Sequence, residues 1–273
     1  MKHFFKTIVL LFFISNAGHA VSASLEVFVS ILPQQYLVKS IGGEHVNVTV
    51  MVKPGQSPAT FEPSPKAMSR YSTADVYFTI GMPFEKVWIN RVASLNQSIL
   101  VVNTQDKNKT SKKFDPHTWL SPLLIMNQAE IIKNELIRLS PQHKAYFMAH
   151  FQQLEANISA LHYELSTLFK DNNKHNFITF HPAFSYFSRA YGLTQMAIEV
   201  DGKEPSAKQI AHILQQIKDK NVHYILVEKQ FNKVIAKTIA DSVDAQLLQI
   251  DPLALDYLNN MRDIGNKINK ALF

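Results

Sequence analysis

Three residues of metal-binding type stand next to predicted structural elements in this 273-residue chain. His117 precedes a predicted helix, whereas His181 and Asp251 each follow a predicted strand directly. Imidazole nitrogens and carboxylate oxygens are the donors that Zn²⁺ or Mn²⁺ accepts when no thiolate is offered. The sequence contains no cysteine, which excludes thiolate zinc sites, iron–sulfur clusters and disulfides. These residue types therefore predict a cation site built from nitrogen and oxygen ligands.

Glu228 is a fourth candidate ligand, because it directly follows the strand-like residues 224–227. It could bind the cation itself or orient a histidine ligand from behind. A lone histidine or aspartate in such a place is more often a cap or turn residue, and the sequence has no HExxH, CxxC or EF-hand motif. A shared site is favoured by the joint position of His117, His181 and Asp251 on the two sides of a predicted cleft.

The elements that must position these residues form an α/β protein of two lobes, each a mostly parallel sheet flanked by helices. The strand-like segments are 25–30, 46–52, 76–80 and 99–102 in the first lobe, and 177–180, 195–200, 224–227 and 247–250 in the second. The lobes should span residues 24–140 and 172–273. Ligands of open α/β sheets bind beyond the carboxyl ends of the strands and between domains, so the cleft is the expected site.

Residues 141–171 are predicted to form one linking helix of about 45 Å between the lobes. Ser140 is expected to cap this helix, with Pro141 in its first turn. A single long helix is a stiffer joint than several extended strands, so we expect little motion of the lobes when a ligand binds.

The first 23 residues have the pattern of a cleaved signal peptide. Lys2 and Lys6 accompany an apolar run too short to span a bilayer, and small residues offer cleavage after Ala20 or Ala23. We expect a periplasmic protein that is free rather than lipid-anchored, because it lacks cysteine. The net charge of +6 is scattered except for lysines within 107–113, which lack interleaved aromatic residues, so no nucleic-acid partner is expected.

Short motifs occur in a characteristic order along residues 25–273. They are 54–65, Ile80-Gly81-Met82-Pro83-Phe84-Glu85, Asp115-Pro116-His117-Thr118-Trp119-Leu120-Ser121-Pro122, Phe180-His181-Pro182-Ala183-Phe184, Gly202-Lys203-Glu204-Pro205-Ser206, Val227-Glu228-Lys229-Gln230-Phe231 and Asp251-Pro252-Leu253. In number and order they resemble the solute-binding proteins of ATP-driven zinc and manganese importers. The resemblance implies a monomeric binding protein, not an enzyme, that carries Zn²⁺ (or Mn²⁺) as cargo to an inner-membrane ABC transporter permease. It also implies four metal ligands, of which His117, His181 and Asp251 match the last three.

The first ligand position of the family does not match. Pro58-Ala59 stands where the family usually has Pro-His, and an alanine methyl cannot bind a cation. Water, Glu62 or Glu228 could take the missing place. Histidine at position 181, rather than a carboxylate, favours Zn²⁺ over Mn²⁺ because nitrogen donors suit zinc. The lysines of residues 107–113 replace the histidine- and acid-rich loop of many zinc-specific relatives, so this segment should not collect metal.

Two other functions remain open at the level of the sequence. The loss of the histidine at Ala59 would suit a family member that binds a chelated metal or a small organic solute. Two histidines, one aspartate and a water would also suit an open-site metal hydrolase with Glu228 as its base, although no hydrolase motif occurs.

Overall fold

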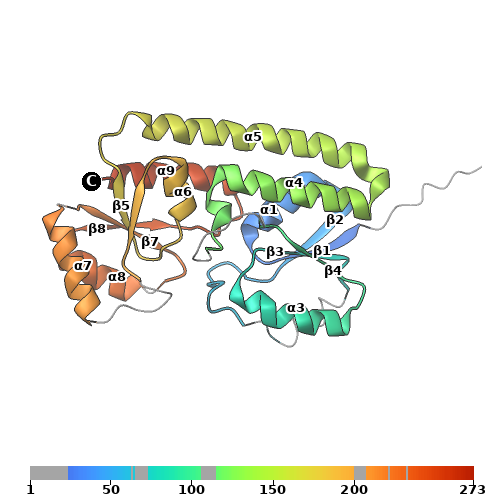
Figure 1. Ribbon diagram of the computed structural model, residues 1–273, viewed down its shortest axis with the longest axis horizontal. Coiled ribbons are helices and arrows are strands. Elements are labelled where there is room, and N and C mark those ends of the chain that lie inside the picture. Colours follow the sequence, from blue (N-terminus) through green and yellow to red (C-terminus); the bar gives the residue numbers. More distant parts are fainter. Residues whose placement is uncertain are drawn as a thin grey trace, which may run out of the picture.

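A computed structural model describes residues 24–62, 64, 73–105, 115–199, 207–220, 222–231 and 233–273. The predicted signal peptide, the lysines of 107–113 and the motif at 202–206 lie outside these residues. In the described part of the chain, two α/β lobes lie beneath one long helix (Figure 1). None of the helices in this part is long and apolar enough to cross a membrane.

The first lobe is built on a four-stranded sheet in the order β2-β1-β3-β4, with every pairing parallel. Its strands are β1 Leu25–Val29, β2 Val46–Val50, β3 Val76–Thr79 and β4 Leu100–Asn103. Its helices are α1 Leu32–Gly42, α3 Pro83–Leu95 and α4 Pro122–Leu139, with 3₁₀ turns at Gly43–His45 and Thr118–Leu120. All four residues of β3 are buried, as expected for an inner strand of a parallel sheet that is covered on both faces.

The second lobe repeats the same plan, with the order β6-β5-β7-β8 and only parallel pairings. Its strands are β5 Asn176–Thr179, β6 Thr194–Ala197, β7 Tyr224–Glu228 and β8 Gln246–Ile250. Its helices are α6 Ser185–Ala190, α7 Ala207–Asp219, α8 Lys233–Asp241 and α9 Tyr257–Ala271. The predicted two-lobed α/β fold is therefore confirmed.

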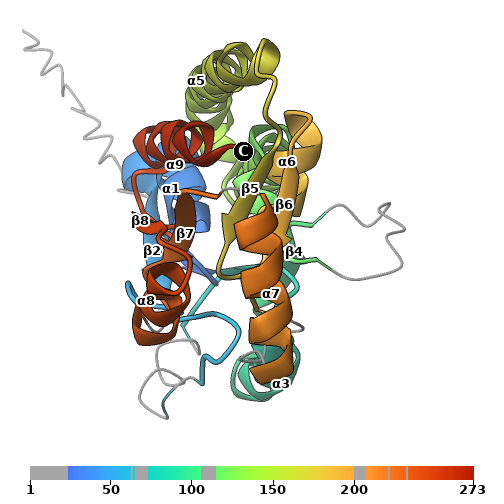
Figure 2. The same ribbon diagram turned by 90° about the vertical axis from the view of Figure 1, so that its left-hand side faces the viewer.

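The long helix α5 Lys144–Lys170 runs across both lobes, above α4 of the first and α9 of the second (Figures 1 and 2). Its buried residues recur every three or four positions and form one apolar stripe. They are Phe147, Phe151, Leu154, Ile158, Leu161, Leu165 and Phe169. This stripe packs on α1 and α4 on one side and on α9 on the other, which confirms a long helix between the lobes.

The start of this helix differs from the prediction. Residues Pro141–His143 form a 3₁₀ turn, and the Ser140 side chain makes no capping hydrogen bond. Instead, the backbone N–H of Ser140 donates to Leu136 O and closes α4. The expected serine cap was wrong because this residue ends one helix before the next begins.

The hydrophobic core is continuous between the lobes. One cluster of buried side chains includes Phe78 of the first sheet, Phe147 of α5 and Tyr257 of α9, and a smaller cluster lies between the second sheet and the helices α7 and α8. The buried Trp119 of the first lobe donates from its indole Nε1 to Pro252 O of the second at 2.8 Å. A shared core of this kind resists movement of one lobe against the other.

Candidate metal centre

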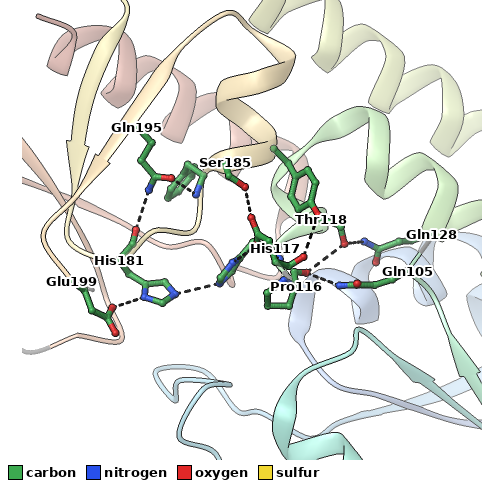
Figure 3. A network of polar contacts seen from close by, with 12 residues as sticks. Gln105, Pro116, His117, Thr118, Gln128, His181, Ser185, Gln195 and Glu199 are labelled. Carbon is green, nitrogen blue, oxygen red and sulfur yellow. Dashed lines mark hydrogen bonds and ion pairs between the residues drawn. The ribbon is translucent and has the colours of Figure 1, made fainter. Parts of the chain in front are cut away.

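Two imidazole rings from opposite lobes meet in the cleft, with their planes inclined at 73° (Figure 3). The Nε2 atoms of His117 and His181 are 3.3 Å apart. His117 immediately precedes the 3₁₀ turn Thr118–Leu120, and His181 follows β5 by two residues. Both side chains are 15% exposed, so the pair is mostly enclosed but remains reachable from solvent.

A carboxylate holds the other nitrogen of each ring. His117 Nδ1 lies 2.7 Å from Asp115 Oδ1, and His181 Nδ1 contacts Glu199 Oε2. Ionised carboxylates only accept hydrogen bonds, so each Nδ1 carries the proton and each Nε2 presents a lone pair to the cleft. Carboxylates that fix metal-binding imidazoles in this way are common behind metal sites.

The electrostatics keep His117 neutral. Burial lowers its pKa below the ordinary histidine value, and this effect outweighs the opposing hydrogen bond and charge of Asp115. Burial would raise the pKa of Asp115, but hydrogen bonds from the ring and backbone N–H of His117 and from the Ser185 hydroxyl hold it below the ordinary value. Asp115 also joins the lobes, because its Oδ2 accepts from the Ser185 hydroxyl and its backbone O accepts from Tyr186 OH at 3.3 Å.

The separation of the two Nε2 atoms suits a bound cation. For Zn–N bonds of about 2.0–2.1 Å and a tetrahedral angle of about 109°, two imidazole ligands are separated by about 3.3–3.4 Å. Two neutral imidazoles that both donate through Nδ1 have lone pairs facing across the 3.3 Å gap. These lone pairs repel each other unless a proton or a cation lies between them.

A cavity of about 30 Å³ adjoins the two rings. Both lobes line it, with the residues Ser57, Pro58, Ala59, Met82, His117, Trp119, His181, Ala183, Gln230, Phe231, Pro252 and Leu253. A water needs about 10–15 Å³ on this scale, so the cavity accommodates an ion with one or two waters. Phe231 stacks on His181, with ring centroids 4.9 Å apart, and closes one side.

The other two predicted ligands, Asp251 and Glu228, do not line this cavity. Asp251 Oδ2 pairs with Lys229 Nζ at 3.2 Å, while Asp251 Oδ1 accepts from Gln230 Nε2 and from the backbone N–H of Leu253, both at 3.0 Å. Glu228 is completely buried, and its carboxyl oxygens accept from the backbone N–H of His181 at 3.3 and 3.4 Å. Among the described residues, no three His, Cys, Asp or Glu side chains come together to hold a metal ion.

Two supporting residues were not identified as functional from the sequence. Asp115 lies two residues before His117, and Glu199 lies two residues beyond the end of β6. Glu199 also fits the rule that singled out His181, Asp251 and Glu228, which is that a polar residue just past a strand can reach a site at the edge of the sheet. It was overlooked because the predicted strand 195–200 was too long by three residues and included it.

Glu228 provides a test of the site's electrostatics. Burial raises its pKa to about 8. The folded state thus holds a proton that the unfolded state has released above about pH 4.3. The stability due to this group is fully present below that unfolded value and is lost as the pH rises through about 8.

Glu228→Gln removes this ionisation but keeps an oxygen for the His181 N–H. Between about pH 5 and about pH 8.5, the metal-free variant should gain roughly 4 kcal/mol of unfolding free energy relative to the parent, because the pKa of Glu228 is about 4.3 in the unfolded chain and about 8 in the folded one, and one pKa unit is worth about 1.4 kcal/mol. Denaturant unfolding of both proteins in chelator at the two pH values measures this difference. A stability difference that does not change with pH would contradict the raised pKa.

Fold and site together define a class of protein, the two-lobed solute-binding protein with a helical joint and a histidine-lined cleft. Residues 27–271 match the family described as "Zinc-uptake complex component A periplasmic", ZnuA. The chain belongs to this ZnuA family.

Comparison with individual relatives supports the same family assignment. A crystal structure of ZnuA is 33% identical, has a TM-score of 0.87 and aligns over 91% of this chain and 99% of its own. A zinc-bound deletion mutant of ZnuA is also 33% identical, with a TM-score of 0.85 over 91% of this chain and 98% of its own. A Chlamydia muridarum protein is 30% identical over 255 residues, 91% of this chain and 92% of the relative.

Proposed function

We propose that this protein captures a divalent metal ion, preferentially Zn²⁺, between His117 and His181 and delivers it to an inner-membrane ABC importer. The observation that carries this proposal is the 3.3 Å separation of the two Nε2 atoms, which matches two imidazole ligands on one tetrahedral zinc ion. The protein would act as a monomer in the periplasm after removal of its signal peptide, with cleavage after Ala20 or Ala23.

The groups around the two histidines suit this cargo. Both imidazoles are held by carboxylates in the tautomer that a metal ligand requires. Glu228 supports the backbone of His181 from behind, and water would fill any coordination place that no protein ligand occupies. Nitrogen donors favour zinc over manganese.

The dimensions of the cleft argue against the other two functions. A cavity of about 30 Å³ is too small for an organic solute or a chelated metal and suits a single ion. Glu228, the candidate base of a hydrolase, is completely buried behind the His181 backbone and does not line this cavity.

Calorimetric titration of the chelator-stripped mature protein with Zn²⁺, followed by competition with Mn²⁺, tests the proposal. We expect one site per chain with micromolar or tighter affinity for Zn²⁺ and weaker binding of Mn²⁺, because both identified donors are nitrogens. Absence of binding by either metal would refute the proposed function.

A further inference from the structure

Gln230 lies at the metal cavity but is not one of the ligands predicted from the sequence. It follows the end of β7 by two residues and lines the cavity together with His117 and His181. Its Nε2 donates to Asp251 Oδ1 at 3.0 Å, and Asp251 Oδ2 is paired with Lys229 Nζ at 3.2 Å. A carboxylate accepts hydrogen bonds and does not donate them, so this contact fixes which end of the Gln230 amide is the oxygen.

The oxygen of this amide has no hydrogen-bond partner among the described residues. Gln230 Oε1 is buried and accepts no hydrogen bond within the part of the chain that the structure describes. An unsatisfied buried oxygen costs about 1–3 kcal/mol, so native proteins normally supply a donor, a water or an ion. Here the residue that carries it lines the same cavity as two imidazole lone pairs.

We propose that Gln230 Oε1 is the third protein ligand of the bound metal and substitutes for the ligand lost at Ala59. This inference rests on the proposed function, because it requires an ion between His117 and His181. Asp251 is then a positioning residue that holds the Gln230 amide, with its own charge balanced by Lys229. A neutral amide oxygen is a harder donor than imidazole and makes the site less selective for zinc than a three-histidine site would be.

The test compares the zinc affinity of the parent with that of Gln230→Met, which keeps the side-chain length and removes the oxygen. We expect about a tenfold or greater loss of affinity, since one ligand to the ion is removed. Gln215→Met is the matched control, because Gln215 Nε2 also donates to an aspartate, Asp219 Oδ1, at 2.8 Å, but on the exposed surface of α7. The control should bind zinc as the parent does.

Asp251→Asn distinguishes a positioning role from direct ligation. Asparagine keeps an oxygen for the Gln230 amide to donate to, so its loss of affinity should be smaller than that of Gln230→Met. With Co²⁺ in the site, the visible absorption spectrum should change in Gln230→Met, because a ligand is lost, and should stay that of the parent in Asp251→Asn. Thermal unfolding of the metal-free variants verifies that each is folded.

The possible results of these titrations distinguish a failure of the Gln230 assignment from a failure of the proposed function. Zinc affinity within twofold of the parent in Gln230→Met, with an unchanged Co²⁺ spectrum, would overturn the assignment of Gln230 while the histidine site stands. A loss in Asp251→Asn as large as that in Gln230→Met would overturn the positioning role of Asp251. If the parent itself binds no metal, the proposed function fails, and the role of Gln230 fails with it.

Discussion

Replacing His117 with alanine is expected to weaken zinc binding by about a hundredfold or more. Structural zinc sites with four ligands have binding free energies of about 10–16 kcal/mol, so one ligand accounts for roughly 3 kcal/mol. The loss should be at least as large here, because two imidazoles meet with their Nε2 atoms 3.3 Å apart and no third His, Cys, Asp or Glu joins them within the described residues. Calorimetric titration of the stripped variant with Zn²⁺ measures the loss.

His181→Ala should lose zinc affinity to the same degree, but its effect on folding must be measured separately. This substitution leaves Glu199, which is 6% exposed, without its imidazole partner. An unpaired buried carboxylate destabilises the fold, so thermal unfolding of the metal-free variant belongs beside the titration.

The control for both variants is His212→Ala. His212 is an exposed residue of α7 and does not line the cavity, so this variant should bind zinc as the parent does. Zinc affinity that persists in both His117→Ala and His181→Ala would show that the ion binds elsewhere on the chain.

Restoring a histidine at position 59 is expected to have the second-largest effect, in the opposite direction. Ala59 is exposed on the loop that follows β2, yet it lines the same cavity as His117 and His181. Because position 59 is exposed, an imidazole there can reach the cleft without being forced into the packed interior. A third nitrogen ligand should raise zinc affinity by about tenfold or more, and should raise manganese affinity less.

The matched control for Ala59→His is Thr60→His. Thr60 is the next residue on the same exposed loop and does not line the cavity, so its histidine should leave zinc affinity unchanged. Equal zinc affinity in the parent, Ala59→His and Thr60→His would mean that the loop does not approach the ion.

The Gln230 assignment can also be tested in the Ala59→His background. If the amide oxygen occupies the coordination place that the missing histidine left open, Gln230→Met should cost less affinity there than in the parent, because the two substitutions act on one shared site. Additive effects of the two substitutions would show that histidine 59 and Gln230 act independently.

The two-lobed fold and the long helix between the lobes could be predicted from the sequence. Strand and helix periods are local properties, because each element must bury its own apolar face. Each of the eight predicted strands accordingly overlaps an observed one, from β1 Leu25–Val29 to β8 Gln246–Ile250. The residue types of His117 and His181, together with their places beside predicted elements, were sufficient to mark them as a candidate pair.

The groups that contact these histidines could not be predicted from the sequence, because they come from segments that only the folded chain brings together. Glu199 reaches His181 because the parallel pairing of β5 and β6 continues past both strands, with the Glu199 N–H donating to Phe180 O at 2.8 Å. Asp251 is engaged by Lys229 and Gln230 because β8 pairs with β7, so the loops that follow these strands are neighbours. Sheet register and the docking of the two lobes set these contacts. Hydrophobic periodicity predicts neither of them, because it indicates only which face of an element is buried.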